Sequence, residues 1–434
     1  MTHPYIPNTA DDRRQIMSRL GIHKVDELFG DIPGEFRDPR IELPPQLSEQ
    51  ELVAELSALA WKNVLPARPI SFLGAGAYRH YTPAVVSHIV NRGEFKTAYT
   101  PYQPEISQGT LQTAFEFQSM VCELTGMDVA NTSMYDGASA LAEACLMAAS
   151  VTGRRRIALL STMHISFESV VRTYAAGKSL EVDVFEPDQV RLTGEHACLA
   201  VQNPNFFGYF EDVDVLGEQA HQAGSLYIVS ADPVSLGIFR PPAVYGADIV
   251  VGEGQSLGIP PSYGGPYLGL FACRSELVRK MPGRIVGRTA DSEGRTAYVL
   301  TLQTREQHIR RENATSNICT SQQLLALAAT VYVATMGKHG LRRVAELCYH
   351  KAHYAAQRIA ELPGYELASG GEFFHEFVVR CPGPVADLLE RLEQRGIIAG
   401  FDVSDRFDRG LLVCVTEMNS RSEIDRLVES LAQP

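Results

Sequence analysis

Small and polar residues gather directly before a predicted apolar helix. They form the segment Ser133-Met134-Tyr135-Asp136-Gly137-Ala138-Ser139, and the helix is expected over residues 138–149. The first turn of a helix offers free N–H groups and the positive end of the helix dipole, which suit a phosphate. An ordinary Asp or Ser cap uses the same residue types. Both interpretations stay open from this segment alone.

Further residues that can do chemistry follow the ends of four predicted strands. A histidine there can contact a ligand ring, paired amides can hold a ligand oxygen, and an aspartate can pair with a protonated ring nitrogen. Loop packing and turn formation explain the same residues without a ligand. Because ligands of open α/β sheets bind beyond the carboxyl ends of the strands, these loops are the first candidates for a site. The segments are Met163-His164, Gln202-Asn203-Pro204-Asn205, Ala231-Asp232-Pro233 and Gly254-Gln255-Ser256-Leu257-Gly258.

A loop crossed by two prolines combines aromatic rings, a carboxylate and hydrogen-bonding groups. Its residues are Tyr99, Thr100, Tyr102, Gln103, Glu105, Ser107 and Gln108. Polar density of this kind on a loop favours a functional site, and a rigid interface loop with buried tyrosines is the structural alternative. A second candidate contact is residues 74–80, where Arg79 can bind a carboxylate or form a structural salt bridge. The glycines of that segment lack the spacing and position of a dinucleotide fingerprint.

Short apolar runs that alternate with helical segments must position these loops. Crossover helices are expected at 138–149, 167–176 and 213–223, and a helix at 111–125 leads into the first strand. This spacing predicts one large α/β domain with a mostly parallel, buried sheet. Its seven strands are expected at 128–133, 157–161, 182–186, 198–202, 225–231, 248–252 and 268–273.

Two flanking regions complete the predicted organisation, which places an arm at 1–69, the α/β domain at 70–320 and a C-terminal α+β domain at 321–434. The arm shows short helices at 11–20 and 24–29 and a capping box, Ser48 with Glu51, that opens a helix through Trp61. It holds too little apolar surface for a domain and is expected to wrap a neighbour. Beyond a polar stretch at 284–317, helices are expected at 321–336, 341–362, 384–395 and 422–431, and strands at 376–380 and 411–416.

Charge, hydropathy and cysteine usage limit the partners and the compartment. Fifty-one acidic against 39 basic residues give a formal charge of −12, which argues against a nucleic-acid partner. No run reaches the roughly 18 apolar residues of a membrane span, and the N-terminus lacks an apolar signal region. Eight cysteines without a C-x-x-C pair are expected to be reduced, and no metal site is expected. These features predict a cytoplasmic protein that binds neither nucleic acid nor membranes.

The order of the polar segments resembles the large domain of aminotransferase-like, fold type I pyridoxal-phosphate proteins. Residues 135–139, 202–205, 231–233 and 252–258 further resemble the N-terminal half of glycine decarboxylase, the P protein of the glycine cleavage system. The most specific likeness to that family is Thr97-Ala98-Tyr99-Thr100-Pro101-Tyr102-Gln103-Pro104-Glu105-Ile106-Ser107-Gln108-Gly109. Over its full length the chain is similar to the first subunit of the two-gene form.

One position departs from an active pyridoxal enzyme. Such enzymes bind the cofactor aldehyde through a lysine in the loop where this chain has Gln255. The chain has seven lysines, none lies between Asp232 and Lys280, and Lys280 is expected on the surface. Because an amide forms no Schiff base, the resemblance implies that this chain binds no cofactor covalently and that pyridoxal phosphate sits on a homologous partner subunit. The chain's own pocket would be a relic built from Asp136, Gly137, Ala138, Ser139, His164, Asn203, Asp232 and Gln255.

The resemblance implies subunit 1 of a heteromeric glycine decarboxylase, an oxidoreductase, in an α2β2 heterotetramer. The partner's cofactor would act as electron sink while glycine loses carbon dioxide, and the aminomethyl group would pass to the lipoyl arm of the H protein. Residues 305–311, with His308, would contact that acidic H protein or form a solvated helix face. A non-catalytic regulatory or scaffold subunit that binds a small anion at residues 136–139 is the alternative. In the leading interpretation the partner's active site is completed by Tyr99, Tyr102, Gln103 and Glu105, with Thr100, Ser107, Gln108 and Arg79 as further contacts.

Overall fold

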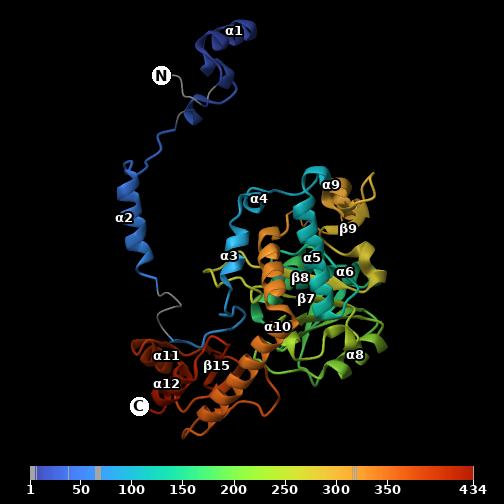
Figure 1. Ribbon diagram of the computed structural model, residues 1–434, viewed down its shortest axis with the longest axis vertical. Helices are drawn as coiled ribbons and strands as arrows, with labels where there is room; N and C mark the ends of the chain where they lie inside the picture. The colour runs from blue at the N-terminus through green and yellow to red at the C-terminus, as the bar shows by residue number, and fades with distance from the viewer. Residues whose placement is uncertain are drawn as a thin grey trace. The chain divides into compact units, whose positions relative to one another are not determined.

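The computed structural model describes residues 5, 7–37, 39–63, 70–314, 316, 318 and 320–433 (Figure 1). The chain divides into two compact units, Met1–Val64 and Leu65–Pro434. The expected arm boundary at residue 69 and the expected reduced state of Cys319 lie outside the described residues. The boundary between residues 320 and 321 stays a prediction. The seven cysteines in the described part are free, and six of them are buried.

The first unit consists of short helices without a core. The capping box predicted at Ser48 and Glu51 is present, and a second one joins Thr9 to Asp12. None of the residues in these helices, all of them described, is buried. The unit therefore leaves its apolar side chains exposed, as expected for an arm. Its elements are α1 (Ala10–Leu20), η1 (Val25–Phe29), η2 (Gly34–Phe36) and α2 (Glu49–Ala60).

The second unit is built on the predicted seven-stranded sheet. The strand order is β2-β8-β7-β6-β5-β3-β4. Strands β4, β3, β5, β6 and β7 run parallel to their neighbours, whereas β8 is antiparallel to both β7 and β2. The mostly parallel sheet is thus confirmed, although the first strand is shorter than predicted. The strands are β2 (Val129–Ala130), β3 (Arg156–Leu160), β4 (Glu181–Phe185), β5 (His196–Asn203), β6 (Leu226–Ala231), β7 (Ile249–Glu253) and β8 (Gly269–Cys273).

Helices cover both faces of this sheet because successive side chains of a buried strand point to opposite sides. Ile157 and Leu159 of β3 pack in one apolar cluster with α6 (Gly137–Thr152) and α7 (Ile165–Gly177). Ala158 and Leu160 pack in a second apolar cluster, on the other face, which includes residues of three further long helices. These are α5 (Gln108–Thr125), α8 (Val213–Gln222) and α10 (Gln323–Ala360). Figure 1 shows α5 and α10 lying over β7 and β8.

Helix α10 contains both of the long helices predicted at 321–336 and 341–362. Gly337 interrupts it with φ of 59°, a left-handed conformation that glycine adopts without a Cβ clash. In the described residues, α10 is the one helix long and apolar enough to cross a membrane by length and composition. Leu341, Val344 and Ile359 are buried in the core. Core packing therefore covers part of the apolar surface of this helix, and 39% of its apolar stretch is buried.

The C-terminal segment forms the predicted α+β arrangement. A four-stranded antiparallel sheet has the order β11-β12-β15-β14. Strand β1 (Ile70–Ser71) pairs in parallel with β13 (Ile397–Ile398), so the start of this unit is bound to its C-terminal part. The remaining elements are β11 (Glu366–Leu367), β12 (Glu376–Arg380), α11 (Val385–Gln394), β14 (Phe401–Asp402), β15 (Gly410–Cys414) and α12 (Arg421–Leu431).

The polar stretch at 284–317 contains structure that the sequence analysis did not predict. Strands β9 (Ile285–Ala290) and β10 (Thr296–Thr301) form an antiparallel hairpin. Val286 and Leu300 are buried against Leu111 and Ala114 of α5, whereas the outer residues of β9 are exposed. Short helices complete the unit: α3 (Ala84–Val90), α4 (Gly93–Lys96), η3 (Pro104–Ile106), η4 (Ser235–Gly237), η5 (Pro242–Tyr245), η6 (Ser275–Lys280), η7 (Gln303–Arg305), α9 (Gln307–Arg310) and η8 (Arg311–Asn313).

Candidate functional site

A cavity of about 40 Å³ lies beyond the carboxyl ends of β5, β6 and β7. His164 and Asp232, two of the predicted pocket residues, line it. Asn203 instead accepts a hydrogen bond from the Glu211 N–H (3.0 Å), and its neighbours Gln202 and Asn205 line the cavity. One water needs roughly 10–15 Å³ measured in this way, so the space suits a few waters. The strand-end loops meet as the fold predicts, but they leave little room.

The N-terminus of α6 already carries an anion from this chain. Asp136 caps the helix by accepting the Ser139 N–H at 2.7 Å, so the ordinary cap interpretation is correct for this residue. The Gly137 N–H donates to Oε2 of Glu253 at 2.9 Å. Ala138 and Ser139 are buried. A small-anion site at residues 136–139, the basis of the regulatory alternative, is therefore not favoured.

Gln255, which stands where a cofactor-binding lysine was expected, is part of the internal hydrogen bonding. It is 1% exposed. Its Nε2 donates to the carbonyls of Tyr78 and Ile259 at 2.8 and 2.6 Å, and its Oε1 accepts the Tyr78 N–H at 2.7 Å. Both polar atoms of the side-chain amide therefore form hydrogen bonds to backbone groups. Lys280 is exposed, as predicted.

The segment at residues 74–80, expected as a second contact, is folded against the cavity. Glu376 accepts hydrogen bonds from the Ala75 N–H at 2.7 Å and the Tyr78 hydroxyl at 2.8 Å. Burial raises the pKa of Glu376 to about 7. Arg79 is fixed through its carbonyl, which accepts the Thr416 hydroxyl at 2.7 Å. This segment therefore ties the C-terminal strands to the cavity wall.

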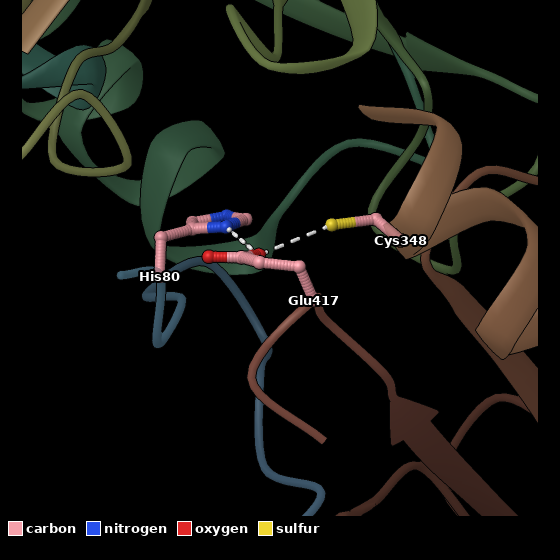
Figure 2. Close-up of side chains that lie close together, drawn as sticks. All are labelled: His80, Cys348 and Glu417. Atoms are coloured by element: carbon pink, nitrogen blue, oxygen red, sulfur yellow. Dashed lines mark hydrogen bonds and ion pairs between the residues drawn. The ribbon is translucent and has the colours of Figure 1, made fainter. Parts of the chain in front are cut away.

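His80 ends that segment in a buried cluster with Cys348 of α10 and Glu417 (Figure 2). His80 Nδ1 lies 2.7 Å from Glu417 Oε2, and Cys348 Sγ donates to the same oxygen at 3.4 Å. The potential ligand atoms of the three residues lie within 4.8 Å of one another. In this structure they hydrogen-bond to each other, and the expectation of no metal stays a prediction.

The surroundings of Asp232 and Gln255 do not fit pyridoxal phosphate on this chain. Asp232 Oδ1 accepts the Val234 N–H, and Oδ2 lies 3.6 Å from Nδ1 of His375. The Tyr78 ring packs 4.4 Å from the His375 ring. The two rings line the cavity that Asp232 faces, and an amide replaces the lysine. A cofactor pocket is typically several hundred Å³, an order of magnitude larger than this one.

The tyrosine-rich loop lies on the surface, away from that cavity. Tyr99 is 76% exposed and Tyr102 is 48% exposed. Gln103 and Glu105 are exposed, whereas Thr100, Ser107 and Gln108 are half-buried. Tyr99 and Tyr102 are therefore not buried within this chain, and the rigid interface loop stays an alternative. The loop presents its rings, carboxylate and amide outward.

Two anchors hold this exposed loop on the hairpin side of the unit. Gln108 Nε2 donates to the Tyr298 carbonyl, and Gln108 Oε1 accepts the Tyr298 N–H, both at 2.8 Å. Arg284 Nη2 donates to the Tyr102 hydroxyl at 3.0 Å, and its guanidinium lies 5.4 Å from the centre of the Tyr102 ring. Gln108 therefore positions the loop through β10, and Arg284 through a side chain of the loop itself.

Arg284 belongs to a buried cluster that sequence analysis missed. Its Nε lies 3.4 Å from Glu306 Oε2, and His308 Nδ1 lies 3.5 Å from the same carboxylate oxygen. The His308 ring also packs edge-on against Tyr102 at 5.6 Å. Burial raises the pKa of Glu306. In the sequence, Arg284 is visible only as an arginine directly before the apolar start of β9. No local sequence pattern connects it with Tyr102.

A groove of about 200 Å³ lies beside the loop. Its walls include Tyr99, Thr100 and Arg284, together with Lys96 and the first residues of α10. It is about five times larger than the strand-end cavity. Of the loop residues proposed for catalysis, Tyr99 borders this groove, whereas none of the predicted relic residues does.

The basic segment at 305–311 is only partly available to a partner. Arg305 donates to the backbone carbonyls of Met281, Gly283 and Leu302, and burial lowers its pKa. Arg310 and Arg311 are exposed. The H-protein contact of this segment stays a prediction, and within the segment Arg305 holds the residues before β9.

The sequence matches the family model described as glycine cleavage system P-protein over residues 3–431. The chain belongs to the glycine cleavage system P-protein family. Among its relatives, the probable glycine dehydrogenase (decarboxylating) subunit 1 of Thermomicrobium roseum is 52% identical over 99% of both chains. The protein of the same name in Chlorobium limicola is 51% identical over 99% of both chains.

Solved structures place this P-protein-family chain in the fold that its motifs predicted. A glycine decarboxylase (P-protein) of the glycine cleavage system, in inhibitor-bound form, matches with a TM-score of 0.91 and 41% identity over 99% of both chains. Glutamate decarboxylase of Lactobacillus brevis matches with a TM-score of 0.65 at 13% identity, over 94% of this chain and 96% of that one, which bears on the fold alone. The aminotransferase-like, fold type I architecture is confirmed.

Proposed function

We propose that this chain is subunit 1 of a heteromeric, pyridoxal-phosphate-dependent glycine decarboxylase of the glycine cleavage system. A second P-protein subunit carries the cofactor, which supplies the electron sink for loss of carbon dioxide from glycine. The aminomethyl group then passes to the lipoyl arm of the H protein. The two subunits form an α2β2 heterotetramer in the cytoplasm. The names of relatives about 50% identical over the full chain support the role of subunit 1.

The observation that carries this proposal is the contrast between a filled cavity and an exposed motif loop. The cavity holds about 40 Å³, and Gln255, which hydrogen-bonds to the lining residues Tyr78 and Glu253, stands in place of a lysine. The family motif at residues 97–109 instead exposes Tyr99, Tyr102 and Glu105. Exposed aromatic rings on a loop that is anchored to the rest of the chain are suited to contact with a partner protein. A chain of this kind serves a pocket that lies on another subunit.

We assign a separate role at the partner's pocket to the aromatic and to the polar residues of the loop. Tyr99 and Tyr102 provide flat apolar walls that exclude water from the reacting carbon. Gln103 and Glu105 provide an amide and a carboxylate that can orient the amino group of glycine or hold its proton. Arg284 is assigned a positioning role, because it holds the hydroxyl and the ring of Tyr102.

The test is to express the chain alone, the second subunit alone, and both together. Glycine-dependent exchange of carbon dioxide is expected only from the heteromer. Borohydride reduction followed by peptide mass analysis is expected to place all of the bound cofactor on a lysine of the second subunit. A reduced cofactor on one of the seven lysines of this chain would overturn the proposal. Full exchange activity of the second subunit without this chain would overturn it as well.

The regulatory or scaffold alternative makes a different prediction for the same preparation. Replacing Tyr99, Tyr102 and Glu105 together would leave exchange unchanged if the chain only supported assembly. The proposal expects loss of exchange while the heteromer still elutes at its original size. Size-exclusion chromatography with light scattering, run beside the exchange assay, separates the two roles.

A further inference from the structure

The carboxylate of Glu253 sits in the position that the fold offers to a phosphate. Its Oε2 accepts the Gly137 N–H at the first turn of α6. Its Oε1 accepts the N–H groups of Gln255 at 3.0 Å and Leu268 at 3.1 Å. Three backbone donors from three segments therefore converge on one internal anion. Convergent backbone N–H groups at a helix N-terminus are the usual cradle for a phosphate or a carboxylate.

Packing around Gly137 leaves no space for a second anion. A Cβ at this glycine would lie 3.0 Å from Glu253 Cβ, Glu253 N and Phe167 Cζ. The Glu253 side chain thus rests directly on the first turn of α6. Burial raises the pKa of Glu253 to about 7, against the lowering effect of the N–H donors. At pH 8 the group is ionised and fills the cradle as an anion.

We propose that Glu253 is a built-in replacement for the cofactor phosphate, and that with Gln255 it determines that this subunit excludes pyridoxal phosphate. The missing lysine removes the covalent bond, and Glu253 removes the phosphate site. Because both are needed for cofactor binding in this fold, restoring the lysine alone does not restore a cofactor site. The inference concerns binding by this chain alone, so it stands or falls independently of the proposed glycine chemistry.

The chain offers a matched control for Glu253. Glu376 is a second buried glutamate of the same cavity, and burial raises its pKa to about 7 as well. It binds the Ala75 N–H and the Tyr78 hydroxyl, and not the first turn of α6. E376A therefore removes the same side chain from the same cavity and leaves the cradle filled. E253A removes the anion from the cradle.

The first experiment titrates the full chain with inorganic phosphate at pH 8, against chloride at equal ionic strength. Phosphorus NMR line width and melting temperature report binding. We expect no saturable binding in the wild type or in E376A, and an apparent affinity at least tenfold higher in E253A. If E253A melts below the working temperature, phosphate is expected to raise its melting temperature and to leave that of E376A unchanged.

Each other result overturns the inference. Saturable phosphate binding by the wild type would show that the cradle is open. A folded E253A without phosphate binding, or an unstable E253A that phosphate does not rescue, would show that Glu253 fills no anion site. An equal gain in E376A would show that any enlarged cavity takes phosphate.

A second experiment tests exclusion of the cofactor itself. Q255K and E253A/Q255K are incubated with pyridoxal phosphate, reduced with borohydride and analysed by peptide mass. Labelling at the introduced lysine is expected to be at least tenfold greater in the double variant than in Q255K. Pyridoxal, which lacks the phosphate, is expected to show no such difference. Equal labelling of the two variants by pyridoxal phosphate would contradict the role assigned to Glu253.

Discussion

The strand-end cavity and the surface loop at residues 97–109 differ in whether their polar side chains are paired within the chain or exposed. In and beside the cavity, Glu253 and Gln255 hydrogen-bond to backbone of the same chain, and Glu376 binds the Ala75 N–H and the Tyr78 hydroxyl. On the loop, Gln103 and Glu105 remain exposed, while Gln108 and the Tyr102 hydroxyl fix the loop to the rest of the chain. Buried polar groups need partners, and the three residues at the cavity find them within the chain. The cavity has become part of the scaffold, whereas the loop keeps its groups available.

This difference shows where the chain can still contribute to a reaction. A site requires groups that are held in place and yet not already paired. The loop meets both conditions, because Arg284 and Gln108 fix it while Tyr99 and Glu105 stay exposed. The carboxylates of Glu253 and Glu376 in the cavity meet only the first condition, because they are already paired. The four predictions that follow test this contrast from each side.

The largest effect is expected at the anchor of the loop. Arg284 and Glu306 are both buried, with 3.4 Å between Nε and Oε2. R284M would leave the Glu306 carboxylate buried without its cation, a change that typically costs about 3–5 kcal/mol. Chemical unfolding of the full chain measures this cost. The double variant R284M/E306Q should recover part of the lost free energy of unfolding. A loss below about 1 kcal/mol in R284M would show that Arg284 does not anchor the loop.

The next effect is a pH dependence that belongs to the cavity. Burial raises the pKa of Glu376 from 4.5 to about 7, so the folded chain keeps a proton that the unfolded chain releases above pH 4.5. Stability therefore falls as pH rises from about 4.5 to 7, by about 3 kcal/mol for this group at 1.36 kcal/mol per pKa unit. Unfolding free energies at pH 5 and pH 8 should differ less in E376Q than in the wild type. An identical pH profile for the two proteins would contradict the buried, protonated state.

Much of the framework was predictable because its signals are local. Buried parallel strands show as apolar runs, and Ser48 with Glu51 forms a capping box three residues apart. The amide at Gln255 was visible in the sequence as a missing lysine. The amide instead makes two hydrogen bonds to the backbone of Tyr78, 177 residues away, and one to the carbonyl of Ile259. The contacts with Tyr78 depend on the fold and leave no local signal.

The parts that could not be predicted depend on contacts between distant segments. The β9–β10 hairpin has exposed outer residues and buries only a few apolar ones against α5, so its composition looks like a polar loop. Glu253 is the last residue of β7 and meets Gly137 across 116 residues. An acidic residue at the end of a buried apolar strand was the one available signal. Arg284 meets Tyr102 across 182 residues with no such signal.

A smaller effect is expected from the exposed carboxylate of the loop. In the heteromer, E105A should lower kcat/KM for glycine-dependent carbon dioxide exchange about 10- to 100-fold, the range typical of a lost acid–base or orienting group. E390A is the control, since Glu390 is an exposed glutamate on α11. The melting temperature of this chain should be unchanged in both variants. Equal exchange rates for E105A and E390A would place Glu105 outside the site.

The smallest effect is expected from a single hydroxyl. Y102F keeps the ring but removes the group that accepts the Arg284 Nη2 hydrogen bond at 3.0 Å. A hydrogen bond to a charged group contributes about 1.5–3 kcal/mol when buried, and less here because Tyr102 is half-exposed. If Arg284 acts only by positioning Tyr102, Y102F should lower exchange a few-fold, and R284M should lower it no further in the Y102F background than its stability loss explains. A double variant that multiplies the two losses would instead give Arg284 a contact of its own with the substrate.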